Sequence, residues 1–518
     1  MLSLGLVFAS AAAVSSATTT CDSLQSMATP QVAITTEAVA AVVPPAPGAP
    51  AAPARGGAAP QAGRAGGGAA RGPAVVATPA YCRVKLVLKP TADSKINAEV
   101  WLPNENWNGR FMAVGNGGFG GSIQGLGEMQ TALRLGYATA GGDTGHDEAT
   151  EGSGGMFALG HPEKIVDFAY RAVHEMTATS KKLIDRYYGT APQFSYFKGC
   201  STGGRQAVMA AQRYPEDFDG IIAGALANRH IQMHTSGVAR SIELTRHPEA
   251  AIPAAKAAMV SKAVLDACDT MKEGFLNNPR ACTFDFSKLA CKGADSDSCL
   301  TPPQLKTVEA FYGGTKNSRG ELIFSGQALG NPLPALRGIQ PGGVPGGGFD
   351  TVRIWGFQDA NYDWNKFDLD RDMPIINSKV GFVDAVDPDL SKFKARGGKL
   401  LLYAGWGDTG ITPENTVLYY ESVLNKMGRN QGDFVRLFMV PGMGHCRGGD
   451  GPDTFDSVGT METWREKSVA PTQMMGFNTR SSLSRPICAY PQYAKYKGSG
   501  NIKDASNWSC AAPQTSTR

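Results

Sequence analysis

The sequence predicts an α/β fold in which a mostly parallel sheet is interrupted by a large insertion. Strand-like and helix-like segments alternate from about Cys82 to Asn228, as they do in sheets built from βαβ units. The alternation stops between residues 229 and 386 and returns after residue 386. The 518 residues also exceed the size at which one hydrophobic core stops growing. We therefore expect one core built from both flanks and a separate inserted part.

The first 17 residues resemble a signal peptide. Residues 2–17 form an apolar run that ends in small residues, with Ser15 and Ala17 placed as signal peptidase requires. Ten cysteines, an even number, agree with an oxidising compartment. These features predict a secreted or periplasmic protein. A positively charged start is missing, and the alternative is a buried N-terminal segment.

Residues 18–228 are expected to form the first part of the core. Within them, residues 38–79 are almost entirely Ala, Pro and Gly, which predicts a disordered surface insertion. The segment from about Pro162 to Tyr188 has helical periodicity. The predicted strands cover residues 83–90, 98–103, 109–115, 136–142 and 195–199.

Residues 229–386 are predicted to form a lid domain. They contain four cysteines between Cys268 and Cys299, a Gly/Pro stretch, and then an aromatic-rich segment at residues 353–367. Residues 387–518 form the second part of the predicted core. There, residues 397–408 and 433–446 each read as a strand followed by a polar loop, with a helix over 415–428 between them.

Composition excludes two classes of partner. Fifty Lys and Arg against 46 Asp and Glu leave a net charge of only +4, and no basic block or aromatic-interleaved basic stripe suits a nucleic acid. After the N-terminal segment, no apolar run is long enough to span a membrane. The 42% hydrophobic and 19% charged residues are typical of a globular protein.

The sequence GCSTGG supplies a candidate nucleophile, Ser201. It matches G-x-S-x-G and lies between a predicted strand and a small-residue helix, the context of a nucleophile elbow. Glycines are needed on both sides because the turn is sharp and a side chain would collide with the strand or the helix. The alternative is an ordinary tight turn.

A base and an orienting acid follow downstream. Asp408 ends the strand KLLLYAGWG, and His445 lies in the loop after FVRLFMV, which gives the chain order Ser, Asp, His of α/β-hydrolases. A serine hydroxyl needs such a base, and the base needs a group that fixes its tautomer. The alternatives are a structural loop histidine, and a helix N-cap role for Asp408 before Thr412.

Cys200 precedes the serine and Cys446 follows the histidine. If Ser201 and His445 lie within reach of each other, their neighbours fall within the Cα separation of about 4.4–6.8 Å that a disulfide needs. We therefore predict a Cys200–Cys446 disulfide; the alternative is two unrelated thiols or different partners.

Acyl transfer also requires donors for the developing oxyanion. The loop GNGGFGG follows a predicted strand, so we expect backbone N–H groups of Gly117 or Gly118 to act together with that of Thr202. The same loop is a G-x-G-x-x-G sequence with Asp143 downstream, which leaves a nicotinamide oxidoreductase as an alternative. GGSIQGLG, however, is a poor helix opening for binding a pyrophosphate.

With these motifs, the chain resembles the tannase and feruloyl esterase family, which includes mono(2-hydroxyethyl) terephthalate hydrolase. The resemblance runs from about Cys21 to Cys510 and is carried by GCSTGG, GMGHC, GWGD, WNGRFMAVGNGGFGGSI, ATAGGDTGHD and RYPEDFDGIIAGALA. It implies an α/β-hydrolase core with a lid domain, and Ser201, Asp408 and His445 as the triad. It further implies the disulfides Cys21–Cys82, Cys268–Cys282, Cys291–Cys299 and Cys488–Cys510.

Two departures from the family's pattern concern a metal and the acyl pocket. Family members commonly have a lid calcium loop, but here CDTMKEGFLNNPRAC is shortened, leaving Asp269 and Glu273 with Lys272 between them. Calcium requires six to eight oxygens, so we expect that the site is lost and that no cofactor is required; the alternative is a structural calcium held by Asp269 and Glu273. Ala404 replaces a histidine that many relatives have, which is expected to change the floor of the acyl pocket.

These features predict a carboxylic ester hydrolase acting on esters of aromatic acids, with feruloyl esterase as first choice. The alternatives are a tannase, a terephthalate monoester hydrolase, or a catalytically silent hydrolase-fold binding protein. The alcohol of the ester is expected to belong to a plant wall polysaccharide or a tannin. Five lid aromatics are candidate substrate contacts, each with lid packing as the alternative: Trp355, Phe357, Tyr362, Trp364 and Phe367.

Overall fold

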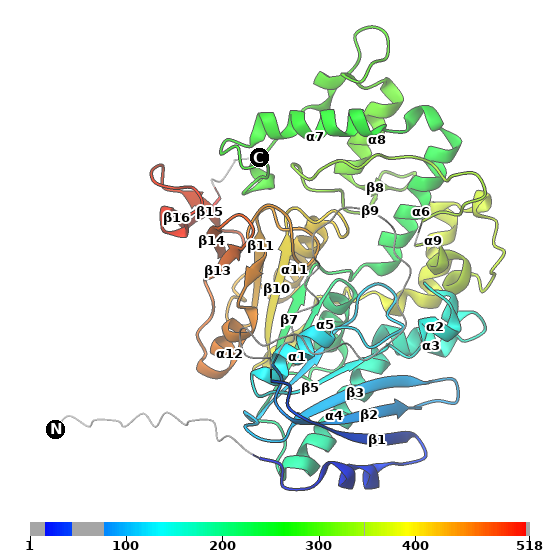
Figure 1. Cartoon of the computed structure of the whole chain (residues 1–518). Helices are drawn as coiled ribbons and strands as arrows, with labels where there is room; N and C mark the ends of the chain where they lie inside the picture. The colour runs from blue at the N-terminus through cyan, green and yellow to red at the C-terminus, as the bar shows by residue number, and fades with distance from the viewer. Residues whose placement is uncertain (1–15, 44–76, 347, 514–518) are drawn as a thin grey trace, which may run out of the picture.

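The computed structural model describes residues 16–43, 77–346 and 348–513 and is centred on a nine-stranded sheet (Figure 1). Residues 1–15 of the predicted signal peptide and residues 44–76 of the predicted insertion lie outside the described part. In spatial order the strands are β1 (Val32–Val39), β2 (Tyr81–Leu88), β3 (Ile96–Pro103), β5 (Ala138–Gly142), β4 (Arg110–Val114), β6 (Phe194–Cys200), β7 (Gly220–Gly224), β10 (Lys399–Gly405) and β11 (Val435–Val440).

The sheet is antiparallel at one edge and parallel over the rest. β1, β2, β3 and β5 pair antiparallel, whereas β5, β4, β6, β7, β10 and β11 all pair parallel. The parallel strands are covered on both faces and are almost continuously apolar; all five residues of β7 are buried. The predicted α/β fold with a mostly parallel sheet is confirmed.

The edge strand β1 is not among the predicted strands, because its polar residues Thr35, Thr36 and Glu37 interrupt the apolar pattern where the strand faces solvent. The structure also corrects the bounds of the predicted disordered insertion at residues 38–79. β1 continues to Val39, and Val42 and Thr78 exchange backbone hydrogen bonds of 2.9 and 3.1 Å. The base of the segment 38–79 is therefore ordered.

Helices pack on both faces of the sheet. The larger core lies under α4 (Ala172–Tyr188), α5 (Thr202–Arg213) and α11 (Pro413–Met427). The opposite face is covered by α1 (Leu126–Arg134) and α12 (Ser457–Lys467). The helix predicted over 162–188 is present as α3 (Pro162–Val166), a π-helical turn, and α4. Short helices α2 (Glu148–Glu151) and α10 (Ser391–Ala395) complete this part.

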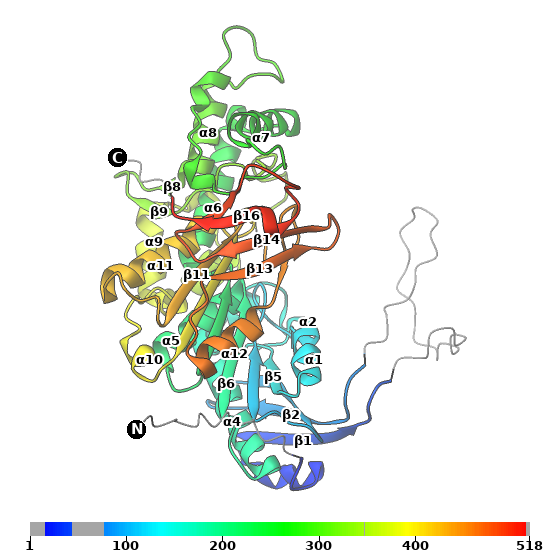
Figure 2. The same cartoon turned by 90° about the vertical axis from the view of Figure 1, so that its left-hand side faces the viewer.

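Residues 229–386, here called the lid segment, contribute no strand to the nine-stranded sheet. Figures 1 and 2 show its helices α7 and α8 at the end of the molecule farthest from β1 and β2. Its elements are α6 (His230–Arg246), α7 (Ala254–Cys268), α8 (Pro302–Gly313), β8 (Thr315–Lys316), β9 (Leu322–Phe324) and α9 (Leu369–Val380). None of the helices within the described ranges is long and apolar enough to cross a membrane.

After β11 the chain forms two small antiparallel sheets. The first contains β12 (Thr454–Phe455), β13 (Gln473–Asn478) and β14 (Leu483–Cys488), and the second contains β15 (Tyr493–Tyr496) and β16 (Trp508–Ala511). Five disulfides are present, and they are the five expected pairs: Cys21–Cys82, Cys200–Cys446, Cys268–Cys282, Cys291–Cys299 and Cys488–Cys510.

Candidate active site

Ser201 stands in a sharp turn between β6 and α5. Its φ of 64° and ψ of −121° are strained for a residue with a side chain. Two backbone hydrogen bonds hold the turn. Ser201 N–H donates to the carbonyl of Gly224 in β7 at 3.0 Å, and Arg205 N–H donates to the Ser201 carbonyl at 3.1 Å. This is the geometry of a nucleophile elbow, and the serine is half-buried where the chain turns from the sheet into the helix.

Gly199 and Gly203 are required by this turn. A Cβ on Gly199 would lie 2.4 Å from the Gly203 carbonyl oxygen, which is closer than any real contact. A Cβ on Gly203 would lie 3.1 Å from the Asn116 carbonyl oxygen, in the loop after β4. The glycines therefore let the strand, the helix and the loop approach one another around Ser201.

Asp408 and His445 form a hydrogen-bonded pair at the ends of β10 and β11. His445 Nδ1 lies 2.8 Å from Asp408 Oδ2, while Asp408 Oδ1 accepts from the N–H groups of Gly410 and Ile411 at 2.8 and 2.9 Å. Because the carboxylate only accepts, Nδ1 carries the proton and Nε2 is the ring nitrogen left to act as a base. The N-cap of α11 is Thr412, so the N-cap alternative for Asp408 does not apply.

The electrostatics of the pair suit a general base. The Asp408 side chain is only 1% exposed. Its hydrogen bond raises the pKa of His445 above the ordinary 6.5, and partial burial of the ring opposes this. The carboxylate therefore stabilises the charged imidazolium that forms when the ring accepts a proton.

Ser201 and His445 line one cleft of about 700 Å³, here called the catalytic cleft. Their side chains form no hydrogen bond to each other in the described structure. In enzymes without bound substrate, the hydrogen bond between nucleophile and base is often long and shortens when substrate binds. The neighbouring Cys200 and Cys446 are joined by a disulfide with a Cα separation of 5.9 Å. The disulfide thus ties the elbow to the loop that carries the histidine.

Residues 115–121 form the loop after β4, here called the oxyanion loop, and only one of its two candidate glycine amides is free. Gly117 N–H donates to Gln124 Oε1 at 2.7 Å, so this amide is already used, whereas Gly118 N–H has no acceptor within the described residues. The loop is tied to α5, since Gly203 N–H donates to the Asn116 carbonyl at 2.7 Å and Thr202 Oγ1 donates to the Gly118 carbonyl at 2.5 Å. Thr202 begins α5, and its N–H has no partner inside the helix.

The lid aromatics do not line the catalytic cleft. Trp355 is 1% exposed, and its indole N–H donates to the Gly155 carbonyl at 3.1 Å. Phe357 stacks on Tyr362 at 4.7 Å, and Trp364 packs against the same lid core. Lid packing therefore accounts for all three. They are apolar and follow one another closely, so the sequence cannot distinguish them from a substrate wall.

The residues proposed for calcium are engaged with protein groups instead. Asp269 accepts from the N–H groups of Met271 and Gly274, and Glu273 accepts two bonds from Arg485, at 2.6 and 3.1 Å. The Arg485 side chain is fully buried against Trp508, 3.7 Å from the ring centroid. These two carboxylates do not fit calcium, because the Arg485 guanidinium already neutralises the buried Glu273 carboxylate.

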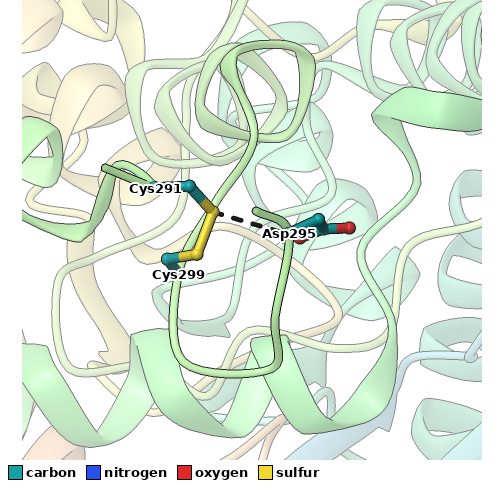
Figure 3. Close-up of side chains that lie close together, drawn as sticks. All are labelled: Cys291, Asp295 and Cys299. Atoms are coloured by element: carbon teal, nitrogen blue, oxygen red, sulfur yellow. Dashed lines mark hydrogen bonds between the residues drawn. A yellow bond between two sulfur atoms is a disulfide. The ribbon is translucent and has the colours of Figure 1, made fainter. Parts of the chain in front are cut away.

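A second group of side chains that are able to bind metals lies in the lid segment (Figure 3). Cys291, Asp295 and Cys299 lie close together, but the two sulfurs are joined in a disulfide and so offer no thiolate. The Asp295 carboxylate accepts from the buried Lys256 ammonium. This group is explained by packing of the lid.

Ala404 does not lie at the floor of the acyl pocket, where it was expected. It is 1% exposed in the main core beneath the sheet, so it does not form the floor of the catalytic cleft. Its neighbour Tyr403 points to the opposite face, as alternation along a strand requires, and lines the cleft. Sequence reasoning missed Tyr403 and Gln124, although the strand period could have identified the tyrosine.

Comparisons with known proteins agree with this site. The sequence profile described as "Tannase and feruloyl esterase" matches residues 82–342 and 334–511. An uncharacterized esterase of Xanthomonas campestris is 37% identical over 84% of this chain and 85% of its own length. A probable feruloyl esterase B-2 of Aspergillus terreus is 32% identical over 83% and 86%.

A crystal structure of feruloyl esterase B from Aspergillus oryzae superposes with a TM-score of 0.81 and 28% identity, covering 95% of this chain and 99% of that chain. The sequence profile, the relatives and the fold each match most of this chain. This chain therefore belongs to the tannase and feruloyl esterase family and is a carboxylic ester hydrolase with an α/β-hydrolase fold.

Proposed function

We propose that the protein hydrolyses esters of phenolic acids through Ser201, with His445 as general base and Asp408 as the residue that orients it. The observation that carries this proposal is the Asp408–His445 hydrogen bond beside a serine held in a strained elbow. Strain of this kind is retained where function requires it. The fixed tautomer leaves His445 Nε2 to accept the serine proton.

The reaction follows from these positions. Ser201 Oγ attacks the carbonyl carbon while His445 Nε2 takes the hydroxyl proton, and the carbonyl oxygen becomes an oxyanion held by the N–H groups of Gly118 and Thr202. As the carbon–oxygen bond to the alcohol breaks, His445 returns the proton to the leaving alkoxide. Water then attacks the acyl enzyme in the same way and releases the acid and Ser201.

A ferulic acid ester is the proposed substrate. Its support is the names of the Aspergillus terreus relative, a probable feruloyl esterase B-2, and of the Aspergillus oryzae structure, feruloyl esterase B. A secreted or periplasmic location is proposed on the five disulfides, which persist in oxidising compartments.

The test is hydrolysis of three esters in parallel: methyl ferulate, methyl gallate and mono(2-hydroxyethyl) terephthalate. The wild type is expected to release ferulate fastest, and Ser201→Ala to release none of the acids above background. Ser378→Ala, an exposed serine on α9, is the matched control and should retain wild-type rates. If gallate or terephthalate is released fastest, that acid and not ferulate is the preferred acyl group. No turnover of any ester would refute the proposal.

A further inference from the structure

The catalytic cleft leads away from the triad on the face of the sheet that carries α1 and α12. Its walls come from the oxyanion loop, the end of β6, Tyr403 of β10, the loop after His445, and β12. Glu128 of α1 and Ser457 of α12 both line it, and Figures 1 and 2 show these two helices near each other, well below α7 and α8 of the lid segment. None of the described residues of the lid segment lines this cleft.

The direction of the reaction decides which half of an ester occupies the cleft. The carbonyl oxygen must face the N–H groups of Gly118 and Thr202, whereas the alcohol oxygen must face His445 Nε2, which protonates it. The wall beyond His445 continues through Cys446 and Arg447 to Phe455. An alcohol half that leads away from His445 within this cleft would therefore lie against this wall.

The charges of the cleft leave one cation without a partner. Lys198 Nζ is paired with Glu128 at 2.7 Å. Asp453 accepts from the Gly448 N–H at 3.0 Å and lies 3.6 Å from an Arg480 nitrogen. Arg447 is exposed at the cleft wall, and no carboxylate of the described residues lies within ion-pair distance of it. The cleft thus presents one uncompensated guanidinium two residues after His445.

The cleft also offers aromatic surface and further hydrogen-bonding groups. The rings of Tyr403 and half-buried Phe455 meet edge to face at 5.3 Å. Gly224 makes room for the tyrosine, because a Cβ there would lie 2.2 Å from its ring. Polar side chains of Gln124 and Thr454 lie among the lining residues. Apolar rings with a few polar groups around them suit a ligand whose faces are apolar and whose edges carry hydroxyls.

We propose that the catalytic cleft is the binding site for the alcohol half of the substrate, and that Arg447 selects a hydroxylated alcohol that bears a carboxylate. The guanidinium presents donors that match a carboxylate in two parallel hydrogen bonds. This inference rests on the proposed function, since it assumes that the cleft holds an ester cleaved by Ser201.

The test uses two esters with one acyl group. A ferulate ester of glucose and the same ester of glucuronate differ only in one carboxylate, and methyl ferulate reports the esterase activity itself. For an exposed ion pair, kcat/KM of the wild type should favour the glucuronate ester by up to about five-fold. The preference should weaken at 1 M salt, where exposed charges are screened.

Arg447→Gln should remove this preference, and the loss should appear in KM. Arg186→Gln, an exposed arginine on α4, removes the same charge outside the cleft and should retain the preference. Provided that methyl ferulate is cleaved, two results would overturn the inference. One is a wild type that does not distinguish the two sugar esters, and the other is an Arg447→Gln variant that still distinguishes them. Loss of methyl ferulate cleavage in the wild type would instead refute the proposed function.

Discussion

Removal of the Cys200–Cys446 disulfide should reduce both stability and catalysis, and the size of each effect can be worked out. The two cysteines are 246 residues apart. For a loop of this length, the chain-entropy relation gives a stabilisation of about 5.5 kcal/mol at 25 °C. The two lid disulfides inside the loop span only 14 and 8 residues, so they shorten it little. The double variant Cys200→Ala/Cys446→Ala should lose about this much free energy of unfolding.

The matched control is Cys291→Ala/Cys299→Ala. Its loop of 8 residues predicts a loss of about 2.5 kcal/mol. It lies away from the triad, so kcat should remain at the wild-type value. The Cys200–Cys446 variant should lose about 100-fold in kcat, because a displacement of about 1 Å between Ser201 and His445 has that effect. Urea unfolding and ester hydrolysis measure the two losses. A variant with wild-type kcat and an equal loss of stability in both pairs would refute the reasoning.

The remaining predictions concern Asp408, the buried Arg485–Glu273 ion pair and calcium. Asp408→Asn should lower kcat by about 10⁴-fold, because the amide no longer fixes the Nδ1–H tautomer. Since Asp408 raises the pKa of His445 above 6.5, wild-type kcat/KM should fall as the pH falls through that raised value, and the variant's profile should shift to lower pH. Arg485→Met should destabilise the protein by about 3–5 kcal/mol by leaving Glu273 buried and unpaired, and adding Glu273→Met should recover most of the loss in urea unfolding. Dialysis against a calcium chelator should shift the melting temperature by less than about 1 °C; a large drop would show that calcium is bound after all.

The sequence predicted the parts of this site that local chemistry determines. The sharp turn at Ser201 could be predicted because a nucleophile elbow needs glycines at fixed positions between a strand and a helix. The Cys200–Cys446 disulfide followed because it constrains two residues that chemistry already brings together. Asp408 and His445 lie in the loops that follow the neighbouring parallel strands β10 and β11, so their side chains meet at one edge of the sheet.

The parts that were missed depend on contacts between distant segments. The use of the Gly117 amide by Gln124 is decided by how the loop after β4 folds back on itself, which no spacing reports. Glu273 is a metal ligand or an ion-pair partner according to whether Arg485, more than 200 residues later, reaches it. Trp355 illustrates the same limit, because its aromatic ring suits a substrate wall and a lid core equally well.

The most direct test of the account is covalent labelling of Ser201 by a serine-directed phosphonate, mapped by mass spectrometry of the digested protein. The account predicts one adduct per chain, on the peptide that contains Ser201. It also predicts loss of ester hydrolysis in proportion to labelling, and no adduct in Ser201→Ala. An adduct on another residue, or a Ser201→Ala variant that still hydrolyses the ester, would contradict the central claim that Ser201 is the nucleophile.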